Sequence, residues 1–399
     1  MFKKVEWSYS TNLYEVNVRQ YTPEGTFKAF AAHMPRLREM GVEVLWFMPV
    51  TPISIKRRKG TLGSYYACSD YTDVNPEFGS LEDFKSIVSE AHSLGFKVII
   101  DWVANHTGWD HKWTIEHPEY YVENEKGEFY DKHGWDDVID LNYYNSGLRR
   151  AMIDAMKFWV TTCDIDGFRC DMAHLVPVDF WREAREELDQ HKPLFWLAES
   201  DDPAYHEVFD ASYTWIWMHK SEEFCKRQIS LRDLKNILIQ QTERFPEDAL
   251  RCYFTTNHDE NSWNGTEYEK YGPAAKNFAV FSATWNGIPL TYSGQELPNN
   301  RRLRFFEKDH INWTGKFELA EFYKNLFELR KKHPALAAGN KSQARFIDTD
   351  ADDFVMVFER WRGDDCVMIA LNFSDKSITA KSTKEEFSLK PFDYLIIEK

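Results

Sequence analysis

The chain has 399 residues and a formal net charge of −15. Because nucleic-acid affinity rests on neutralising phosphates, this acidic balance argues against a nucleic-acid-binding protein. No run of 18 apolar residues occurs, so a membrane-spanning helix is not expected. Aromatic residues make up 16% of the chain. Their flat faces suit a sugar-binding cleft, although many of them must belong to the core.

Strand-like and helix-like segments alternate through the first 340 residues. The near-continuous apolar runs at 42–48 and 97–103 are typical of strands buried on both faces. Further strands are predicted at 13–18, 167–171, 194–199, 208–211, 252–257 and 288–292. Helical spacing of apolar residues predicts helices at 27–40, 81–94, 148–159, 177–190, 221–242, 268–282 and 319–330. Eight strands alternating with helices predict a parallel (β/α)8 barrel, the TIM barrel fold.

Two segments depart from this alternation. Residues 105–145 follow the third strand and are rich in His, Trp, Tyr, Glu and Gly, which indicates an inserted subdomain. After about residue 340, the strand-like stretches 354–360, 366–373 and 389–397 alternate apolar and polar residues, with a turn at 362–365. We therefore assign 1–104 and 146–338 to the barrel, 105–145 to the insertion and 339–399 to a C-terminal antiparallel β-sandwich domain.

Carboxylates stand at the ends of four predicted strands. Barrel enzymes place their chemistry at the C-terminal ends of the strands. The four carboxylates are Asp101, Asp171, Glu199 and Asp259. Charged groups that converge on one barrel mouth are costly to desolvate, so we expect function to retain them. The alternative is a purely structural set.

Arg169 and Asp171 are two residues apart in the fourth predicted strand. Because a strand repeats every two residues, both side chains should leave on the same face. An adjacent guanidinium lowers the pKa of a carboxyl group and keeps it ionised. An ionised carboxylate at the end of a strand can act as a nucleophile. For this stretch alone, a buried structural Arg–Asp pair is an equally simple interpretation.

Paired carboxylates above a sugar-sized cleft suggest glycoside cleavage, in which one group attacks and another donates a proton. Glu199 follows the wholly apolar stretch 194–198. Low polarity there would raise its pKa from about 4.3 to about 6, at a cost of roughly 2 kcal/mol, which suits a general acid. Asp171 fits the nucleophile. Asp259 would be a third carboxylate, able to stabilise positive charge on the sugar ring.

These stretches resemble the signature regions of the α-amylase superfamily, glycoside hydrolase family 13. In the family's order, the four regions correspond to 101–106, 167–174, Glu199 and 254–259. Three further stretches resemble the region of the inserted domain B, the stretch after strand two and the eighth strand, and they lie at 138–142, 66–79 and 287–296. The resemblance runs from about residue 12 to the end of the chain.

The resemblance implies a role for each matching residue. Asp171 would be the nucleophile, Glu199 the general acid/base and Asp259 the transition-state stabiliser. The residues that would bind the substrate are Tyr66, stacked under the sugar, together with His106, Arg169, His174 and His258. The family retains anomeric configuration through a covalent glycosyl-enzyme, which predicts nucleophile and acid carboxyl groups roughly 5 Å apart. For each binding residue the alternative is a packed barrel residue.

Two departures from the family pattern leave the activity open. Ala173 stands where α-amylases usually carry a Lys on the leaving-group side, and no Trp follows two residues after Glu199. The expected activity is cleavage of α-1,4 bonds in starch or maltodextrin. An α-glucosidase or a glucanotransferase of the same family is the nearest alternative. A non-catalytic, sugar-binding relative is the alternative outside this class.

The resemblance also implies a structural calcium ion between domain B and the barrel. Asn105, Asp140 and the backbone carbonyl of His174 fall at ligand positions, and oxygen ligands suit calcium. Asp140 also occurs in calcium-free relatives. We expect an α-glucan as the substrate, a monomer, and neither nucleic acid nor membrane as a partner.

The N-terminal sequence and the cysteines indicate the cellular compartment of the protein. Val5-Glu-Trp-Ser8 follows the first four residues in place of an apolar segment, so no secretory signal is expected in this numbering. The six cysteines form no CxxC pair, which favours free thiols in a reducing compartment. We therefore expect a cytoplasmic protein; a trimmed leader would make it secreted or periplasmic.

Overall fold

The computed structural model describes residues 2–383 and 385–399. Eight strands form a closed parallel barrel, as the sequence predicts, in the order β1-β10-β9-β8-β7-β6-β3-β2. The strands are β1 (Leu13–Val16), β2 (Val44–Phe47), β3 (Lys97–Trp102), β6 (Gly167–Cys170), β7 (Phe195–Ala198), β8 (Ala211–Tyr213), β9 (Leu250–Tyr253) and β10 (Ile288–Tyr292). Their residues are almost all buried, because side chains fill the barrel on one face and helices cover the other.

The chain forms two compact units. Unit 1 comprises Met1–Val5, Tyr14–Asp210 and Leu303–Thr314, and unit 2 comprises Glu6–Leu13, Ala211–Arg302 and Gly315–Lys399.

The helices of unit 1 pack in chain order, with α2 against α4, α4 against α6 and α6 against α7. Their bounds are α1 (Val18–Tyr21), α2 (Phe27–Ala31), α3 (Met34–Glu39), α4 (Leu81–Ser93), α6 (Ser146–Cys163) and α7 (Val178–Leu188). The start of α4 is a capping box between Ser80 and Asp83. The single helix expected over 27–40 is wrong. Pro35 lies in the first turn of α3, where its missing N–H is harmless, so the chain turns before it.

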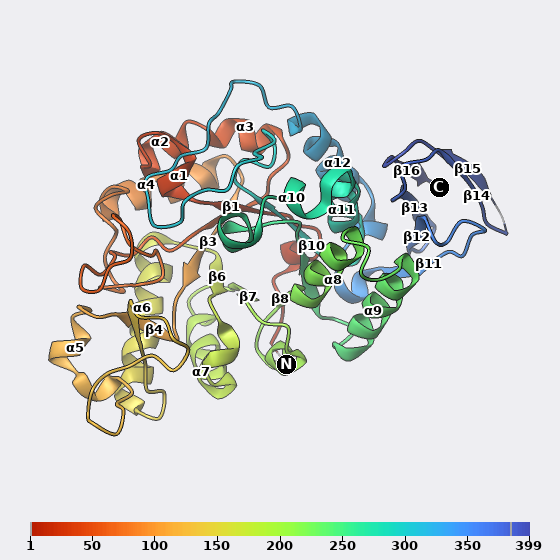
Figure 1. The fold of residues 1–399 in the computed structure, drawn as a ribbon. Helices are drawn as coiled ribbons and strands as arrows, with labels where there is room; N and C mark the ends of the chain where they lie inside the picture. The colour runs from red at the N-terminus through yellow and green to blue at the C-terminus, as the bar shows by residue number, and fades with distance from the viewer. Residues whose placement is uncertain (1, 384) are drawn as a thin grey trace. The chain divides into compact units, whose positions relative to one another are not determined.

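The segment 105–145, orange to ochre in Figure 1, has its own small sheet. Strands β4 (His106–Gly108) and β5 (Val138–Asp140) pair antiparallel, and His106 lies opposite Asp140. Between them lie α5 (Trp113–Glu116) and the 3-10 turn η2 (Pro118–Tyr120). This separate antiparallel pair lies in the chain between the barrel strands β3 and β6, which fits the insertion that the composition predicts.

Asp166 fastens the start of β6 to its neighbours in unit 1. The carboxylate accepts hydrogen bonds from the Val98 backbone N–H at 2.9 Å and from Lys97 Nζ at 3.1 Å, and it lies 2.7 Å from His92 Nε2. Lys192 Nζ lies 3.0 Å from it. Burial favours the protonated form, but these contacts outweigh it and hold the pKa of Asp166 well below its usual range.

Unit 2 contains α8 (Trp215–Cys225), α9 (Leu231–Arg244), α10 (Glu267–Tyr271), α11 (Ala275–Thr284) and α12 (Ala320–Lys332). Two helices expected from the sequence are each divided. The predicted helix 221–242 is broken by Arg227, whose φ of 59° is left-handed, and restarts at the Ser230 cap. The predicted helix 268–282 is broken at Gly272 and Pro273. In both cases a local backbone conformation overrides the apolar spacing.

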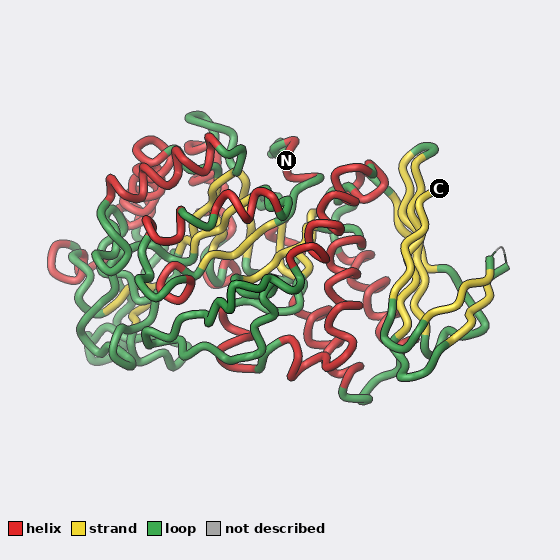
Figure 2. The backbone as a smooth tube through the Cα atoms, turned by 90° about the horizontal axis from the view of Figure 1, so that it is seen from above, coloured by secondary structure: helices red, strands yellow, loops and turns green. Residues whose placement is uncertain are grey.

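The strands at the end of unit 2 pair antiparallel, as predicted. Figure 2 draws strands near the C-terminus in yellow. One sheet has the order β11-β12-β13-β16, and the second consists of β14 and β15. The bounds are β11 (Gln343–Phe346), β12 (Val355–Arg362), β13 (Asp365–Asn372), β14 (Ile378–Lys381), β15 (Glu386–Leu389) and β16 (Tyr394–Glu398). Side chains of both sheets share one buried cluster, including Val357 and Phe387. The strand expected over 389–397 is two strands, because Pro391 and Phe392, at φ 51°, interrupt the pairing.

A buried histidine joins α12 to the C-terminal sheet. His333 Nδ1 lies 2.7 Å from Asp365, and its Nε2 lies 2.7 Å from Glu398. Burial alone would lower the pKa of His333, but the two carboxylates raise it above its usual value. The protonated imidazole therefore acts as a clamp between the two elements.

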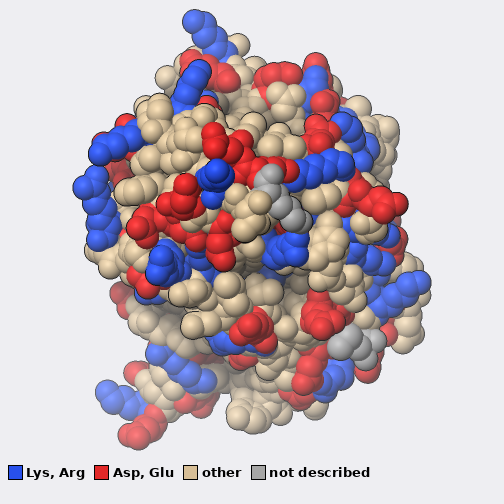
Figure 3. All heavy atoms as spheres, turned by 90° about the vertical axis from the view of Figure 1, so that its right-hand side faces the viewer, with Lys and Arg blue, Asp and Glu red and all other residues tan. Residues whose placement is uncertain are grey.

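In the described part of the chain, no helix has both the length and the apolar character to cross a membrane. Acidic and basic side chains are intermixed on the face that Figure 3 displays.

Candidate active site

One buried guanidinium organises the carboxylates of unit 1. Arg169 Nη1 donates to Asp101 Oδ1 and to Asp171 Oδ1, both at 2.9 Å. Its Nη2 forms an ion pair with Glu199 Oε2, also at 2.9 Å. The Arg169 side chain is 0% exposed, and none of the three carboxylates exceeds 9%. Asp171 and Glu199 are therefore held within reach of one side chain in a site largely closed to water.

Strand register explains why these groups meet. Asp101 of β3 lies opposite Arg169 of β6, and Cys170 lies opposite Ala198 of β7, so Glu199 follows directly beside Asp171. Arg169 and Asp171 leave β6 on the same face, as their spacing predicts. Gly167 permits the approach of β6 to β7, because a Cβ there would lie 2.1 Å from the Phe195 carbonyl oxygen.

Glu199 has more polar surroundings than its sequence suggests. Strand β7 is fully buried and apolar, as expected. The carboxylate itself, however, contacts Arg169 and accepts a hydrogen bond from the Met172 backbone N–H at 2.8 Å. Met172 has a left-handed backbone with φ 41°. Such strained non-glycine positions concentrate at functional sites, and here the strain aims an N–H at the carboxylate.

Asp101 is one of the four strand-end carboxylates expected from the sequence, and it belongs to the site although no individual role was expected for it. Its Oδ2 accepts a hydrogen bond from the Tyr66 hydroxyl at 3.0 Å while its Oδ1 holds Arg169. The Tyr66 ring is stacked on Phe305 and lies 6.0 Å from the Arg169 guanidinium. Asp101 therefore positions both side chains. Its place at the end of a predicted strand was the available sequence signal.

His106 lies at the start of β4 and is 3% exposed. Burial lowers the pKa of its imidazole to about 4, so the ring is neutral at neutral pH. Its Nδ1 lies 3.2 Å from Asn105 Nδ2, and its ring packs edge-on against Trp135. A neutral imidazole can donate a hydrogen bond to one sugar hydroxyl and accept one from another, and no charge has to be desolvated.

His174 and the unit 2 residues complete the predicted set. The His174 side chain is exposed, in the 3-10 turn η3 (Ala173–Leu175), and its carbonyl accepts a hydrogen bond from the Tyr205 hydroxyl at 3.1 Å. In unit 2, Asp259 directly precedes the π-helix η5 (Glu260–Asn264) that follows β9. The buried His258 Nε2 lies 3.3 Å from Asp259 Oδ2.

The residues expected to hold calcium show one feature that fits a cation. Asp140 is 3% exposed, and its Oδ2 accepts from the Lys132 backbone N–H, but its Oδ1 has no hydrogen-bond partner in the described chain. Asp131 repeats this pattern, with Oδ2 bound to two backbone N–H groups and a buried Oδ1 lacking a hydrogen bond. Burial, with the charge of Asp131, raises the pKa of Asp140. Two buried carboxylate oxygens without hydrogen bonds destabilise the folded state unless a hydrogen-bond donor or a cation contacts them.

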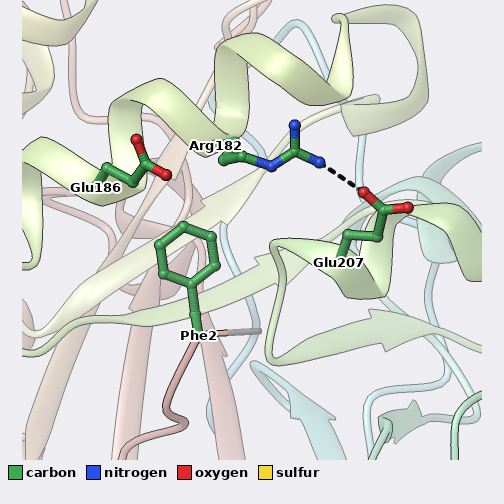
Figure 4. Close-up of a pocket in the computed structure, with 4 residues that line it drawn as sticks. All are labelled: Phe2, Arg182, Glu186 and Glu207. Carbon is green, nitrogen blue, oxygen red and sulfur yellow. Dashed lines mark hydrogen bonds and ion pairs between the residues drawn. The ribbon is translucent and has the colours of Figure 1, made fainter.

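One cavity in unit 1 contains none of the predicted residues. It has a volume of about 420 Å³ and is lined by Phe2, by Arg182 and Glu186 of α7, and by Glu207. Arg182 turns toward Glu207 and pairs with it at 2.6 Å (Figure 4).

Comparison with known proteins gives a consistent set of relatives. A family model described as alpha amylase, catalytic domain, matches residues 8–134 and 117–312. Alpha-amylase MalA of Haloarcula japonica is 27% identical over 392 residues, covering 94% of this chain and 57% of the relative. The cyclomaltodextrin glucanotransferase of Geobacillus stearothermophilus is 29% identical over 399 residues, covering 86% and 53%.

A crystal structure of an alpha-amylase from Lactobacillus plantarum superimposes with a TM-score of 0.87 at 26% identity, covering 98% of this chain and 99% of that one. The chain thus spans little more than half the length of the two curated relatives and nearly all of the solved structure.

Proposed function

The chain belongs to the α-amylase family, glycoside hydrolase family 13, and from this premise we propose that it is a retaining hydrolase of α-1,4-glucosidic bonds in starch or maltodextrin. The observation that carries the proposal is the single guanidinium of Arg169 in contact with both Asp171 and Glu199. It supports a nucleophile and an acid/base close enough to act on one glycosidic bond.

In the proposed reaction, Asp171 attacks the anomeric carbon while Glu199 gives a proton to the departing glycosidic oxygen. This forms a glycosyl ester on Asp171 and releases the shortened glucan. Glu199 then takes a proton from water, which attacks the same carbon and frees the carboxylate of Asp171. Asp259 has the proposed role of stabilising positive charge on the sugar ring between these steps.

The proposed substrate contacts follow from the surroundings of the two carboxylates. Tyr66 would stack beneath the sugar, held by its hydrogen bond to Asp101. Arg169 and the neutral His106 would bind hydroxyl groups at the same ring. For His258 we propose the substrate-binding role that the family resemblance implies. His174, which is exposed, would act farther along the glucan.

A glucanotransferase is the second candidate. Transferases differ from hydrolases in whether a sugar or water accepts the glycosyl group, and both need the same carboxylates. Two observations support this candidate. Ala173 stands where typical α-amylases carry a Lys, and the chain is similar to a cyclomaltodextrin glucanotransferase.

We also propose a structural calcium ion held by Asp140, Asn105 and the His174 carbonyl, with Asp131 as a further ligand. The support is the pair of buried Oδ1 atoms without hydrogen bonds. Carboxylate and carbonyl oxygens are the ligands that calcium prefers. Bound calcium would offset the negative charge of the two carboxylates. It would also tie β5 to the loop before it.

The experiment is a time course of maltoheptaose conversion, followed by chromatography and by proton NMR of the new reducing ends. A hydrolase gives a spread of shorter maltodextrins whose first anomer is α. Products longer than seven glucose units would favour the transferase, and glucose alone an α-glucosidase. First-formed β anomers would contradict the retaining mechanism.

A further inference from the structure

A buried ion pair adjoins Asp259 in unit 2. Glu260, the next residue in the chain, pairs with Lys270 Nζ at 2.8 Å, and the two side chains are 2% and 1% exposed. Glu260 belongs to η5 and Lys270 to α10, so the pair joins two elements. Lys270 Nζ also lies 3.4 Å from Met218 Sδ, in buried surroundings. Lys and Glu are among the residues that are most rarely buried completely, and this pair is largely shielded from water.

Stability alone does not explain the Glu260–Lys270 pair. Removing two charges from water costs about as much free energy as their attraction returns, and apolar side chains of similar volume often stabilise a protein equally well. What the pair adds here is a defined geometry. One carboxylate oxygen of Glu260 binds Lys270, and the other accepts a hydrogen bond from Asn264 Nδ2 at 2.8 Å. The Glu260 side chain is therefore held in one orientation.

The backbone on both sides of Glu260 is closed by hydrogen bonds. Asn257 Oδ1 accepts from the Glu260 N–H at 2.8 Å, and the Asn257 carbonyl accepts from the Asn261 N–H at 3.0 Å. On the other side, the Glu260 carbonyl accepts from the Gly265 N–H at 2.8 Å. Asp259 lies inside the first of these turns. The second is π-helical, a conformation that is rare in proteins and frequent at functional sites.

The burial of Glu260 determines the direction in which Asp259 points. Consecutive residues of a helical turn leave it in different directions. The Glu260 side chain is buried, whereas the Asp259 side chain is 37% exposed. We infer that the Glu260–Lys270 pair positions the Asp259 carboxylate for its action on the sugar ring. Glu260 and Lys270 are thus positioning residues, and the role of Asp259 at the sugar rests on the proposed function.

The position of Asp259 affects the rate because stabilisation of a charge depends on where the opposite charge is held. A carboxylate lowers the barrier when it is fixed beside the positive charge that develops in the transition state. Misplacement of a group by about 1 Å can lower a rate on the order of a hundredfold. Loosening the Glu260–Lys270 pair should therefore lower kcat. It should change KM little, because the ground-state sugar does not carry that charge.

Initial rates of maltoheptaose conversion by Lys270→Met test this inference, in the otherwise wild-type chain and in a chain that also carries Asp259→Asn. We expect Lys270→Met alone to lower kcat about tenfold and to change KM less than about twofold. With Asp259→Asn present, Lys270→Met should change the remaining rate less than about twofold, because the carboxylate that it positions is already gone. Losses that multiply in the double variant would overturn the inference. If circular dichroism shows that Lys270→Met does not fold, Glu260→Gln takes its place with the same expectations.

The matched control is Lys235→Met, the same substitution in α9. Lys235 forms another largely buried ion pair of unit 2, with Asp352 at 3.1 Å. Lys235→Met should leave kcat within about twofold of wild type. An equal loss of kcat in the two Lys→Met variants would overturn the inference, because general loosening of unit 2 would then account for both.

A measurement without turnover separates the inference from the proposed function. His258 Nε2 lies 3.3 Å from Asp259 Oδ2, so the imidazole NMR resonances of His258 report on the position of that carboxylate. Their loss in His258→Gln assigns them. Lys270→Met should shift these resonances and Lys235→Met should not. If wild type converts no maltoheptaose but this pattern is found, the proposed function fails while the positioning of Asp259 stands. Unshifted resonances in Lys270→Met would overturn the inference.

Discussion

Replacing Arg169 by Met should strongly destabilise unit 1. Met keeps much of the side-chain length but leaves Asp101, Asp171 and Glu199 buried together without the guanidinium. Removing one partner of a buried ion pair costs about 3–5 kcal/mol. Since three carboxylates share this cation, we expect a loss of at least about 3 kcal/mol in the free energy of unfolding at pH 8. Urea denaturation followed by tryptophan fluorescence measures it.

The pH dependence of this loss in stability provides an internal check. Carboxylates crowded without a cation bind protons more readily, so the loss should shrink between pH 8 and pH 5. The matched control is Arg149→Met, because Arg149 also pairs with two carboxylates, Asp179 and Glu183, but both are at least half exposed. There we expect about 0–1 kcal/mol. A loss at Arg169 no larger than at Arg149, or one independent of pH, would refute the reasoning.

Three further predictions concern single groups. Asp166→Asn should lower the free energy of unfolding by about 3 kcal/mol at pH 7. Because the pKa of Asp166 is depressed in the folded protein, its contribution to stability is lost as pH falls below about 4. The unfolding curves of wild type and variant should therefore converge in acid. The pKa of His333 is raised in the folded protein, so its contribution to stability is complete below about pH 6.5 and is lost as pH rises. His333→Gln should lower the free energy of unfolding by about 1–2 kcal/mol at pH 6 and by little at pH 9. An equal loss at both pH values would exclude the ionic clamp. Calcium should raise the thermal midpoint of wild type relative to chelator-treated protein, whereas Asp131→Asn should reduce this shift; identical shifts would remove Asp131 from the ligand set.

The barrel was predictable because strands buried on both faces must be apolar, and runs such as 42–48 carry that signal without further context. The divided helices were not. Apolar spacing continues across Pro35 and Arg227, but the backbone at these positions turns the chain. Periodicity reports which face is buried, and it does not report where a helix must restart.

The same distinction applies to the candidate site. The placement of Arg169 and Asp171 on one face follows from the two-residue period of a strand. The contacts of Arg169 with Asp101 and Glu199 depend on the register of three strands, which a single sequence does not specify. Asp131 lies in a loop without periodicity, so its relation to Asp140 appears only in the folded chain.

The most direct test of the central claim is the initial rate of maltoheptaose cleavage by wild type, Asp171→Asn and the control Asp179→Asn, which neutralises an exposed carboxylate of α7. We predict that Asp171→Asn folds normally and loses at least about a thousandfold in rate, because an amide is a poor nucleophile. Asp179→Asn should retain the wild-type rate. A folded Asp171→Asn protein that keeps more than a few per cent of wild-type activity would contradict the nucleophile assignment and, with it, the proposed mechanism.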